Sequence, residues 1–259
     1  MKVLFVCHRL PFPPKRGGKI RPFNIIRHLT AQGHQVTVCS LARSEAELEE
    51  GKGLSDHCER VLIGKVSDSL QMARMVARLP TPVPSSMGWF YSTDLAAKIE
   101  HVLREDHFDL IFVHCSSVAQ YVTRARSIPR ILDFGDMDSQ KWFEYFRYRS
   151  FPVKYGYWLE GAKLQREERR LATEFGFCTA TTRAERETLE SYGTPAVTDW
   201  FPNGVDSDYF APDGSQYDRD QICFVGRMDY YPNQECMFDF CRNVWPIAQL
   251  SLKWARVRR

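Results

Sequence analysis

Short apolar runs alternate with amphipathic helical segments along most of this chain, and that alternation constrains its fold more than any other feature. The runs are fully apolar or rich in β-branched side chains, which is typical of strands buried on both faces of a sheet. They cover residues 2–6, 35–40, 60–63, 109–113, 130–132, 177–181 and 197–201. We expect these segments to form the strands of one sheet.

Helical patterns lie between the runs. The first helix is predicted to begin near Pro22, because proline suits a first helical turn, and to end at Gly33. Further helices are expected over residues 92–104, 157–173 and 183–192. Since crossovers between parallel strands are right-handed, this order predicts an α/β fold with helices on both faces of a parallel sheet. Ligands bind at the carboxyl ends of such strands, so the site is expected in the loops after residues 6, 40, 113, 132, 181 and 201.

The length indicates more than one domain. At about 150 residues per domain, 259 residues correspond to roughly 1.7 domains. Residues 1–202 hold the predicted sheet, and residues 203–219 are rich in Pro, Gly, Asp and Asn, which favours a linker. A strand over 221–225 and a helix over 233–243 then restart the pattern. Residues 220–259 are therefore predicted to begin a second α/β domain, which would need about 100 residues or more.

Composition excludes several classes of protein. The apolar runs are far shorter than the ~20 residues that a membrane span requires, and we expect no signal peptide. The net charge of +3 is too small to indicate nucleic-acid binding. The eight cysteines include no C-x-x-C pair and mostly lie in or beside apolar runs, which favours free thiols in a reducing cytosol over disulfides or zinc.

The loop after the first strand contains Pro13 and Pro14 and then the pair Gly17–Gly18. Paired glycines let backbone N–H groups approach a ligand, and the start of the following helix favours an anion. An ordinary turn explains the same residues. No dinucleotide-binding glycine triplet follows any strand, which disfavours a nicotinamide-dependent oxidoreductase.

Polar residues end two of the predicted strands. His114 lies at the expected ligand-binding edge, although a histidine bonded to nearby backbone is an alternative. Asp133, Asp136 and Asp138 follow another strand and could bind a divalent cation or the hydroxyl groups of a ligand, with Lys141 as their salt partner. Asp136 and Asp138 could equally be turn and N-cap residues.

Residues 142–158 are unusually aromatic. Basic residues at 147, 149 and 154 interleave with nine rings: Trp142, Phe143, Tyr145, Phe146, Tyr148, Phe151, Tyr155, Tyr157 and Trp158. This mixture suits an anionic membrane surface or a groove for a lipid-linked acceptor, and domain packing is the alternative. The small net charge disfavours single-stranded nucleic acid. Mixed charges over 163–170 indicate a solvated helix face.

Four segments, in order, resemble family 4 glycosyltransferases, which have the GT-B fold of two Rossmann-like domains. They are the loop of Pro13 to Gly18, the strand that ends in His114, residues 202–206 with Asn203 and Asp206, and residues 222–227 ending in Gly226–Arg227. Residues 133–142 and 228–233 look like the branch associated with bacterial exopolysaccharide and PEP-CTERM/exosortase systems.

The resemblance implies a retaining transferase that moves a hexosyl-type sugar from a nucleotide sugar to a glycan or lipid-linked acceptor. It implies neither metal nor resident cofactor, and a place in the cytoplasm or at the inner membrane face. Gly17, Gly18 and His114 would lie near the sugar and phosphates. Arg227 would stabilise the charge that grows on the leaving diphosphate, beside Gly226 and Asn233, where the family commonly has a lysine nearby. The residues at 133, 136, 138, 141, 203 and 206 would be structural or on the acceptor side.

One expected feature is absent from the sequence. Retaining family members carry two glutamates deep in the second domain, whereas this chain has only Glu235 after Glu190. Residues 245–259 look like a truncation or a frameshifted tail. We therefore expect an inactive fragment, and the alternative is a non-catalytic module that binds an acceptor or a membrane.

Overall fold

The chain forms two compact units, Met1–Gly204 and Val205–Arg259. The computed structural model describes residues 1–15, 17–212, 214, 216, 218 and 221–251. The predicted domain ranges are not tested by this division. Part of the predicted linker (residues 213, 215, 217 and 219) and both ends of the predicted second domain (residues 220 and 252–259) lie outside the described residues.

Unit 1 is built on one parallel sheet, which confirms the predicted α/β class. Its strand order is β3-β2-β1-β4-β5-β6-β7. Each predicted strand forms, with ends that differ by two residues or fewer: β1 (Lys2–Cys7), β2 (Gln35–Ala42), β3 (Arg60–Lys65), β4 (Leu110–His114), β5 (Arg130–Asp133), β6 (Phe177–Ala180) and β7 (Val197–Trp200). The strand order reverses between β1 and β4, so a ligand crevice is expected at their carboxyl ends.

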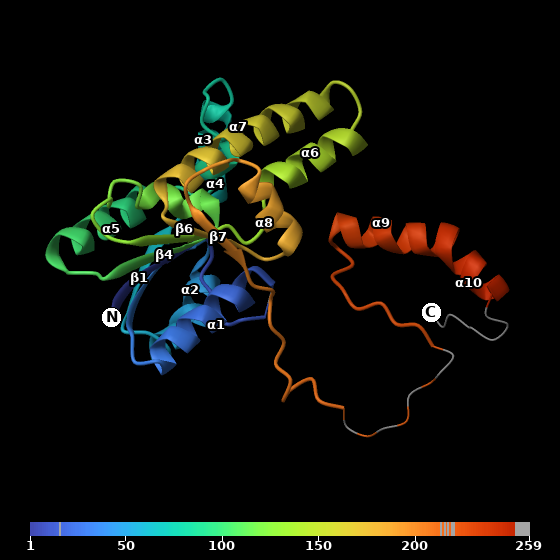
Figure 1. Cartoon of the computed structure of the whole chain (residues 1–259), viewed down its shortest axis with the longest axis horizontal. Helices are drawn as coiled ribbons and strands as arrows, with labels where there is room; N and C mark the ends of the chain where they lie inside the picture. The colour runs from blue at the N-terminus through green and yellow to red at the C-terminus, as the bar shows by residue number, and fades with distance from the viewer. Residues whose placement is uncertain (16, 213, 215, 217, 219–220, 252–259) are drawn as a thin grey trace. The chain divides into compact units, whose positions relative to one another are not determined.

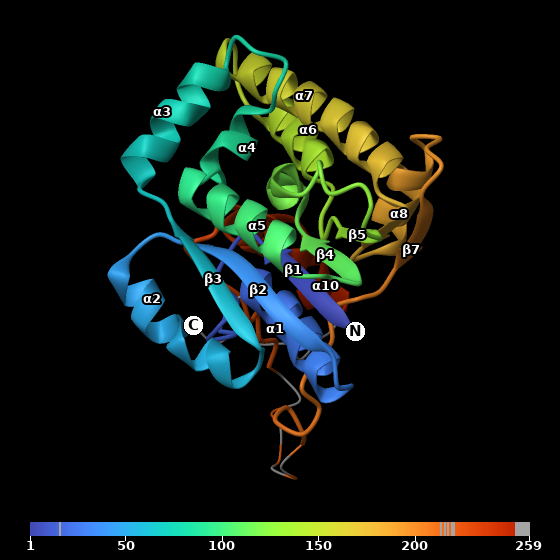
Figure 2. The same cartoon turned by 90° about the vertical axis from the view of Figure 1, so that its left-hand side faces the viewer.

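Helices cover both faces of this sheet (Figures 1 and 2). Alternate side chains of β1 point to opposite faces, because strand side chains have a period of two. Val3 and Phe5 pack in one core with Phe23 of α1, whereas Leu4 and Val6 belong to the other core. The helices of unit 1 are α1 (Gly17–Ala31), α2 (Glu45–Gly51), α3 (Asp68–Arg78), α4 (Ser85–Trp89), α5 (Thr93–Glu105), α6 (Asp138–Tyr148), α7 (Val153–Glu174) and α8 (Arg183–Glu190), with 3₁₀ turns η1 (Lys52–Asp56) and η2 (Ser116–Tyr121).

Helix α1 begins five residues earlier than predicted, so Pro22 lies inside it. Proline lacks the N–H that would bond to the carbonyl of Gly18, but Gly18 is exposed and water can satisfy that oxygen. The predicted end is confirmed, since Gly33 has a φ of +80° just after the helix. Helix α5 is also confirmed, and the Ser92 hydroxyl caps it by accepting from the backbone N–H of Leu95.

Unit 2 contains α9 (Tyr231–Asp239), a π-helical turn η3 (Phe240–Val244) and α10 (Trp245–Ser251). The predicted helix over 233–243 is thus confirmed with an earlier start. The strand predicted over 221–225 does not form. A strand needs a hydrogen-bonded partner, and unit 2 has no second strand within its described residues up to Ser251. That unit 2 begins a nucleotide-sugar-binding domain stays a prediction.

Across the described part of the chain, no helix combines the length and the apolar character that crossing a bilayer requires.

Candidate functional site

A buried carboxylate organises the carboxyl edge of the sheet. Asp133 ends β5 and has no exposed surface. Its Oδ2 accepts from Nε of Arg21 at 2.8 Å and lies 2.7 Å from Nδ1 of His114. Its Oδ1 accepts from Nη2 of Arg21 and from the Thr179 hydroxyl, each at 2.9 Å. Each carboxylate oxygen thus has two hydrogen-bond partners within the protein. In this arrangement neither oxygen is available to an acceptor or a cation.

This network keeps Asp133 ionised. Burial alone would raise the pKa of Asp133, but the hydrogen bonds from His114 and Arg21, together with their charges, hold that pKa far below its usual range. The network also reaches the end of unit 1. Nη1 of Arg21 donates to the Phe201 carbonyl at 2.9 Å and to Oδ1 of Asn203 at 3.3 Å. The guanidinium lies 3.7 Å from the centre of the Phe201 ring.

His114 ends β4 with 5% of its surface exposed. Nδ1 of the ring faces the Asp133 carboxylate, so Nε2 is the ring nitrogen that remains for a ligand. The ring centre of His8, which follows β1, lies 5.7 Å away. Burial, followed by the neighbouring His114 and Arg9, lowers the pKa of His8 well below its usual value. Nδ1 of His8 is buried without a hydrogen-bond partner.

A cavity of about 630 Å³ opens beside His8, at the carboxyl ends of β1 and β2. Its walls come from the loop after β1, from α1, from the segment that joins β2 to α2, and from α4. The lining residues are His8, Arg9, Pro13, Lys15, Lys19, Leu41, Arg43, Ser44, Ala46, Glu47, Glu50, Asp68 and Trp89. The cavity thus lies in the loops after residues 6 and 40, where the sequence predicts a ligand site.

The wall of this cavity combines one aromatic surface with ion pairs. The Arg43 guanidinium lies 4.8 Å from the centre of the Trp89 ring and donates to Asp68 at 2.9 Å. Lys19 pairs with Glu47 at 3.3 Å. An apolar ring surrounded by a few oriented polar groups is typical of a small-molecule site. Sugars present both hydroxyl groups and C–H faces, and this wall offers a surface for each.

The structure brings several predicted residues together. Gly17 and Gly18 begin α1, and a Cβ added to Gly18 would lie 3.9 Å from Nε2 of His8. Gly18 therefore lies beside the pair of histidines, and Asn203 joins the network through Arg21.

The three predicted aspartates differ in their surroundings, and Asp133 is fully buried in the network described above. Asp136 is exposed, and Asp138 is the first residue of α6, so the N-cap is Met137 instead. Burial raises the pKa of Asp138, against the charge of Lys141 and together with those of Asp136 and Glu185. No group of three or more His, Cys, Asp or Glu that could hold a metal ion occurs in the described part of the chain.

The predicted residues of unit 2 form a local cluster of their own. Arg227 donates from Nε to Asp229 at 3.0 Å, and Asn233 donates to the Arg227 carbonyl at 2.9 Å. A Cβ added to Gly226 would lie 2.9 Å from the Phe224 ring, so a larger residue there would displace that ring. Asp206 accepts from the backbone N–H groups of residues 208 and 209, which is a structural turn. Contact of Arg227 with a diphosphate stays a prediction.

Sequence reasoning missed Arg21, Trp89 and Arg43. One signal for Arg21 was available, because an aspartate that ends a buried strand needs a cationic partner. The position of Trp89 had no such signal, since residues 85–89 carry no strong helical pattern.

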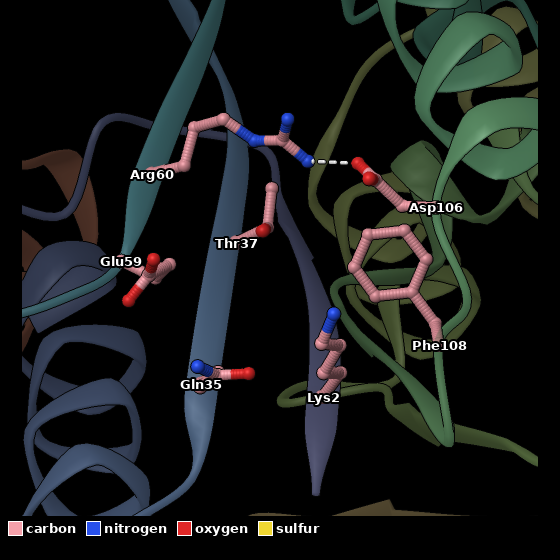
Figure 3. Close-up of a pocket in the computed structure, with 7 residues that line it drawn as sticks. All are labelled: Lys2, Gln35, Thr37, Glu59, Arg60, Asp106 and Phe108. Atoms are coloured by element: carbon pink, nitrogen blue, oxygen red, sulfur yellow. Dashed lines mark hydrogen bonds and ion pairs between the residues drawn. The ribbon is translucent and has the colours of Figure 1, made fainter.

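A second, smaller cavity of about 270 Å³ lies at the opposite edge of the sheet, among the amino ends of β1 and β2 (Figure 3). Arg60 donates to Asp106 across it at 2.5 Å. Parallel α/β sheets bind ligands at the other edge, which favours the larger cavity as the site.

The sheet order and the edge that carries the larger cavity are those of a Rossmann-like α/β domain. Residues 16–209 match Glycosyltransferase Family 4, and the chain belongs to this family.

Solved structures are similar to this chain as well. Sucrose-phosphate synthase from Thermosynechococcus elongatus has a TM-score of 0.53 and 10% identity, over 80% of this chain and 49% of that one. A second structure of that synthase has a TM-score of 0.43 and 12% identity, over 82% of this chain and 93% of that one. This chain thus spans about half the length of the first structure. No curated protein sequence matches it.

Proposed function

We propose that unit 1 is the acceptor-side domain of a retaining glycosyltransferase. The enzyme would move a hexosyl-type sugar from a nucleotide sugar to a glycan or lipid-linked acceptor in bacterial exopolysaccharide or cell-envelope synthesis. The observation that carries this proposal is the cavity of about 630 Å³, which adjoins His8 at the carboxyl ends of β1 and β2. Family membership supports the transferase class, and the sequence resemblance supports the finer assignments.

His114 is the proposed polar contact to the sugar. Asp133 fixes the imidazole through Nδ1 at 2.7 Å, so Nε2 would accept from a sugar hydroxyl without loss of ring orientation. The start of α1 at Gly17 and Gly18 would face phosphate, because free N–H groups and the helix dipole favour an anion there. Trp89 would pack against the C–H face of an acceptor ring.

Arg227 is the proposed donor-side cation. In the transfer, the bond from the anomeric carbon to the diphosphate breaks and a bond to the acceptor oxygen forms on the same face. The acceptor proton passes to the departing diphosphate, which carries the negative charge away. Arg227 would stabilise that charge after exchanging Asp229 for phosphate oxygens. Because Glu235 is the only glutamate after Glu190, we propose that these 259 residues alone turn over slowly or not at all.

Free thiols support a cytoplasmic location for this reaction. All eight cysteines are free, including Cys223, Cys236 and Cys241 at the surface. Thiols persist in that state in a reducing compartment.

Acceptor binding tests the proposal directly. The chain is titrated with a panel of glycans and lipid-linked oligosaccharides, and binding is followed by NMR saturation transfer. We expect Trp89→Ala to weaken binding of the preferred acceptor at least about tenfold, since Trp89 lines the cavity. We expect the same of His114→Ala, because His114 lies next to the cavity residue His8. Tyr209→Ala, which removes an exposed ring outside both the cavity and residues 142–158, serves as the control. Binding that all three variants retain would contradict the assignment of the cavity.

A non-catalytic module is the second candidate function, favoured by the single glutamate after Glu190 and by the exposed rings around Trp158. Release of nucleoside diphosphate distinguishes the two. Acceptor-dependent release that His114→Ala abolishes supports a transferase, and acceptor binding with no release from any nucleotide sugar supports the module.

A further inference from the structure

The connection between α6 and α7 carries a group of exposed apolar side chains. The two helices pack side by side, and the loop that joins them lies at the end away from the sheet (Figures 1 and 2). We call residues 147–159 the aromatic tip. The exposed fraction is 76% for Tyr148 and 78% for Phe151. The other exposed apolar residues of the tip are Val153, Tyr155, Trp158 and Leu159.

Ring contacts below the tip hold the two helices together. Tyr157 of α7 lies 5.4 Å from Trp142 and 5.7 Å from Tyr145 of α6, measured between ring centres. Phe151 contacts Tyr155 within the tip at 6.1 Å. Some rings of the segment are therefore partly buried between the two helices, while Tyr148, Phe151, Tyr155 and Trp158 stay exposed. Single exposed apolar residues are ordinary, but a contiguous group marks an interaction surface.

The charges around these rings are basic. Residues 142–159 contain Arg147, Arg149 and Lys154 but only one acid, Glu144, to which Arg147 donates at 2.7 Å. Lys154 lies 5.2 Å from the centre of the Phe146 ring. Cores of protein–protein interfaces are depleted of lysine, whereas aromatic rings among basic side chains suit the headgroup layer of a bilayer. There the rings enter the apolar boundary and the cations meet anionic headgroups.

We propose that the aromatic tip docks on the surface of an anionic lipid bilayer, with Tyr148, Phe151 and Trp158 entering the interface. The basic side chains at 147, 149 and 154 contact lipid phosphates. This interaction needs no sugar transfer, so it holds for either candidate function.

Co-sedimentation of the full chain with vesicles tests the proposal. We compare vesicles of phosphatidylcholine alone with vesicles that also contain phosphatidylglycerol. We expect at least about tenfold stronger binding to the anionic vesicles, and the triple variant R147Q/R149Q/K154Q loses that preference. The double variant Y148S/F151S binds roughly tenfold or more weakly, because it removes the two most exposed rings of the tip.

Matched variants control for charge and for exposed rings elsewhere. K52Q/R104Q/R183Q removes three exposed cations outside the tip, and Y209S/F210S removes an exposed pair of rings in unit 2. Both keep wild-type binding if the tip is the docking surface. Thermal unfolding by circular dichroism confirms that each variant is folded.

Three results would overturn the proposal. They are no binding of the wild-type chain to anionic vesicles, equal losses in the control variants, and self-association through the tip without vesicle binding. The assay contains no nucleotide sugar, so its failure leaves the proposed transferase function untouched.

Discussion

At the scale of single residues, Asp133 holds the candidate site together. It links β5 to α1 through Arg21, to β4 through His114 and to β6 through Thr179. Arg21 and Asp133 form a buried ion pair. Removal of one partner of such a pair destabilises the fold, because the other charge stays buried without a partner. The network therefore sets the orientation of His114 and the stability of this edge together.

Asp133→Asn tests this role. We expect the free energy of unfolding at pH 7 to fall by about 3 kcal/mol, since Arg21 stays buried without its counter-charge. The folded-state pKa of Asp133 is depressed, so its contribution is present above the unfolded value of about 3.9 and lost as the pH falls below it. The variant lacks that part of the acid dependence. Urea denaturation from pH 3 to pH 7 measures both effects.

The matched control is Asp136→Asn, which changes an exposed aspartate three residues away. A loss below 0.5 kcal/mol for Asp133→Asn, equal to that of the control, would contradict the role of the network.

At the scale of elements, α7 fixes the ends of three other helices. Glu160 accepts from the backbone N–H groups of Ser85 and Ser86 at the start of α4. Glu168 accepts from the backbone N–H and hydroxyl of Ser139 at the start of α6. Lys163 donates to the carbonyls of Arg78 and Leu79 at the end of α3. An acid at the start of a helix and a cation at its end both interact favourably with the helix dipole.

The solvated face predicted for residues 163–170 is therefore wrong for Lys163 and Glu168, which are buried. The charge pattern of a helix cannot show which charged side chains will meet the ends of other helices, because those ends come from distant segments.

Glu168→Gln tests this arrangement through its pH dependence. Burial raises the pKa of Glu168 to about 7, against the hydrogen bonds from Ser139 and Tyr192. The folded state therefore binds a proton more tightly than the unfolded chain. That contribution to stability is complete below the unfolded pKa of about 4.3 and is lost as the pH rises through 7. Glutamine stays neutral, so the difference in unfolding free energy between pH 5 and pH 8 should shrink by roughly 1–3 kcal/mol.

Chemical denaturation at the two pH values measures this difference. Glu187→Gln on α8 removes an exposed glutamate and should leave the pH dependence of the wild-type chain intact. An unchanged pH dependence in Glu168→Gln would show that Glu168 titrates as an ordinary surface acid.

At the scale of the whole molecule, the chain is two units joined by an exposed segment. Unit 1 ends where Arg21 binds Phe201 and Asn203, and the described residues from 205 to 230 are exposed and contain neither helix nor strand. Backbone that lacks burial and regular hydrogen bonds is cleaved first by proteases.

Limited digestion with an aspartate-specific protease tests this division. Five aspartates lie between residues 206 and 220, and we expect the first cuts there. Mass spectrometry should find a stable fragment close to Met1–Gly204. Circular dichroism of that fragment should retain the unfolding transition of unit 1. Early cuts at Asp56 or Asp94 in unit 1 would instead show that the sheet domain is not an independent unit.

The sequence by itself determined the strands of unit 1 and the α/β class. The central strands β1 and β4 are nearly continuous apolar runs, which burial on both faces of a parallel sheet requires. The position of His114 followed equally, since it ends such a run. The predicted end of α1 is confirmed, but the helix begins before Pro22. Its start could not be predicted from Pro22 alone, because solvent can satisfy the Gly18 carbonyl that proline leaves without a donor.

Only the tertiary structure decided which side chains share the site. Arg21 and Asn203 are 182 residues apart in sequence, yet they meet beside Asp133. Trp89, Arg43 and His8 line one cavity from three separate segments. Local sequence encodes local burial and hydrogen bonding, whereas contacts between distant residues depend on how the strands are ordered in the sheet. The polar network and the cavity are therefore properties of the folded sheet, and the strands that carry them are properties of the sequence.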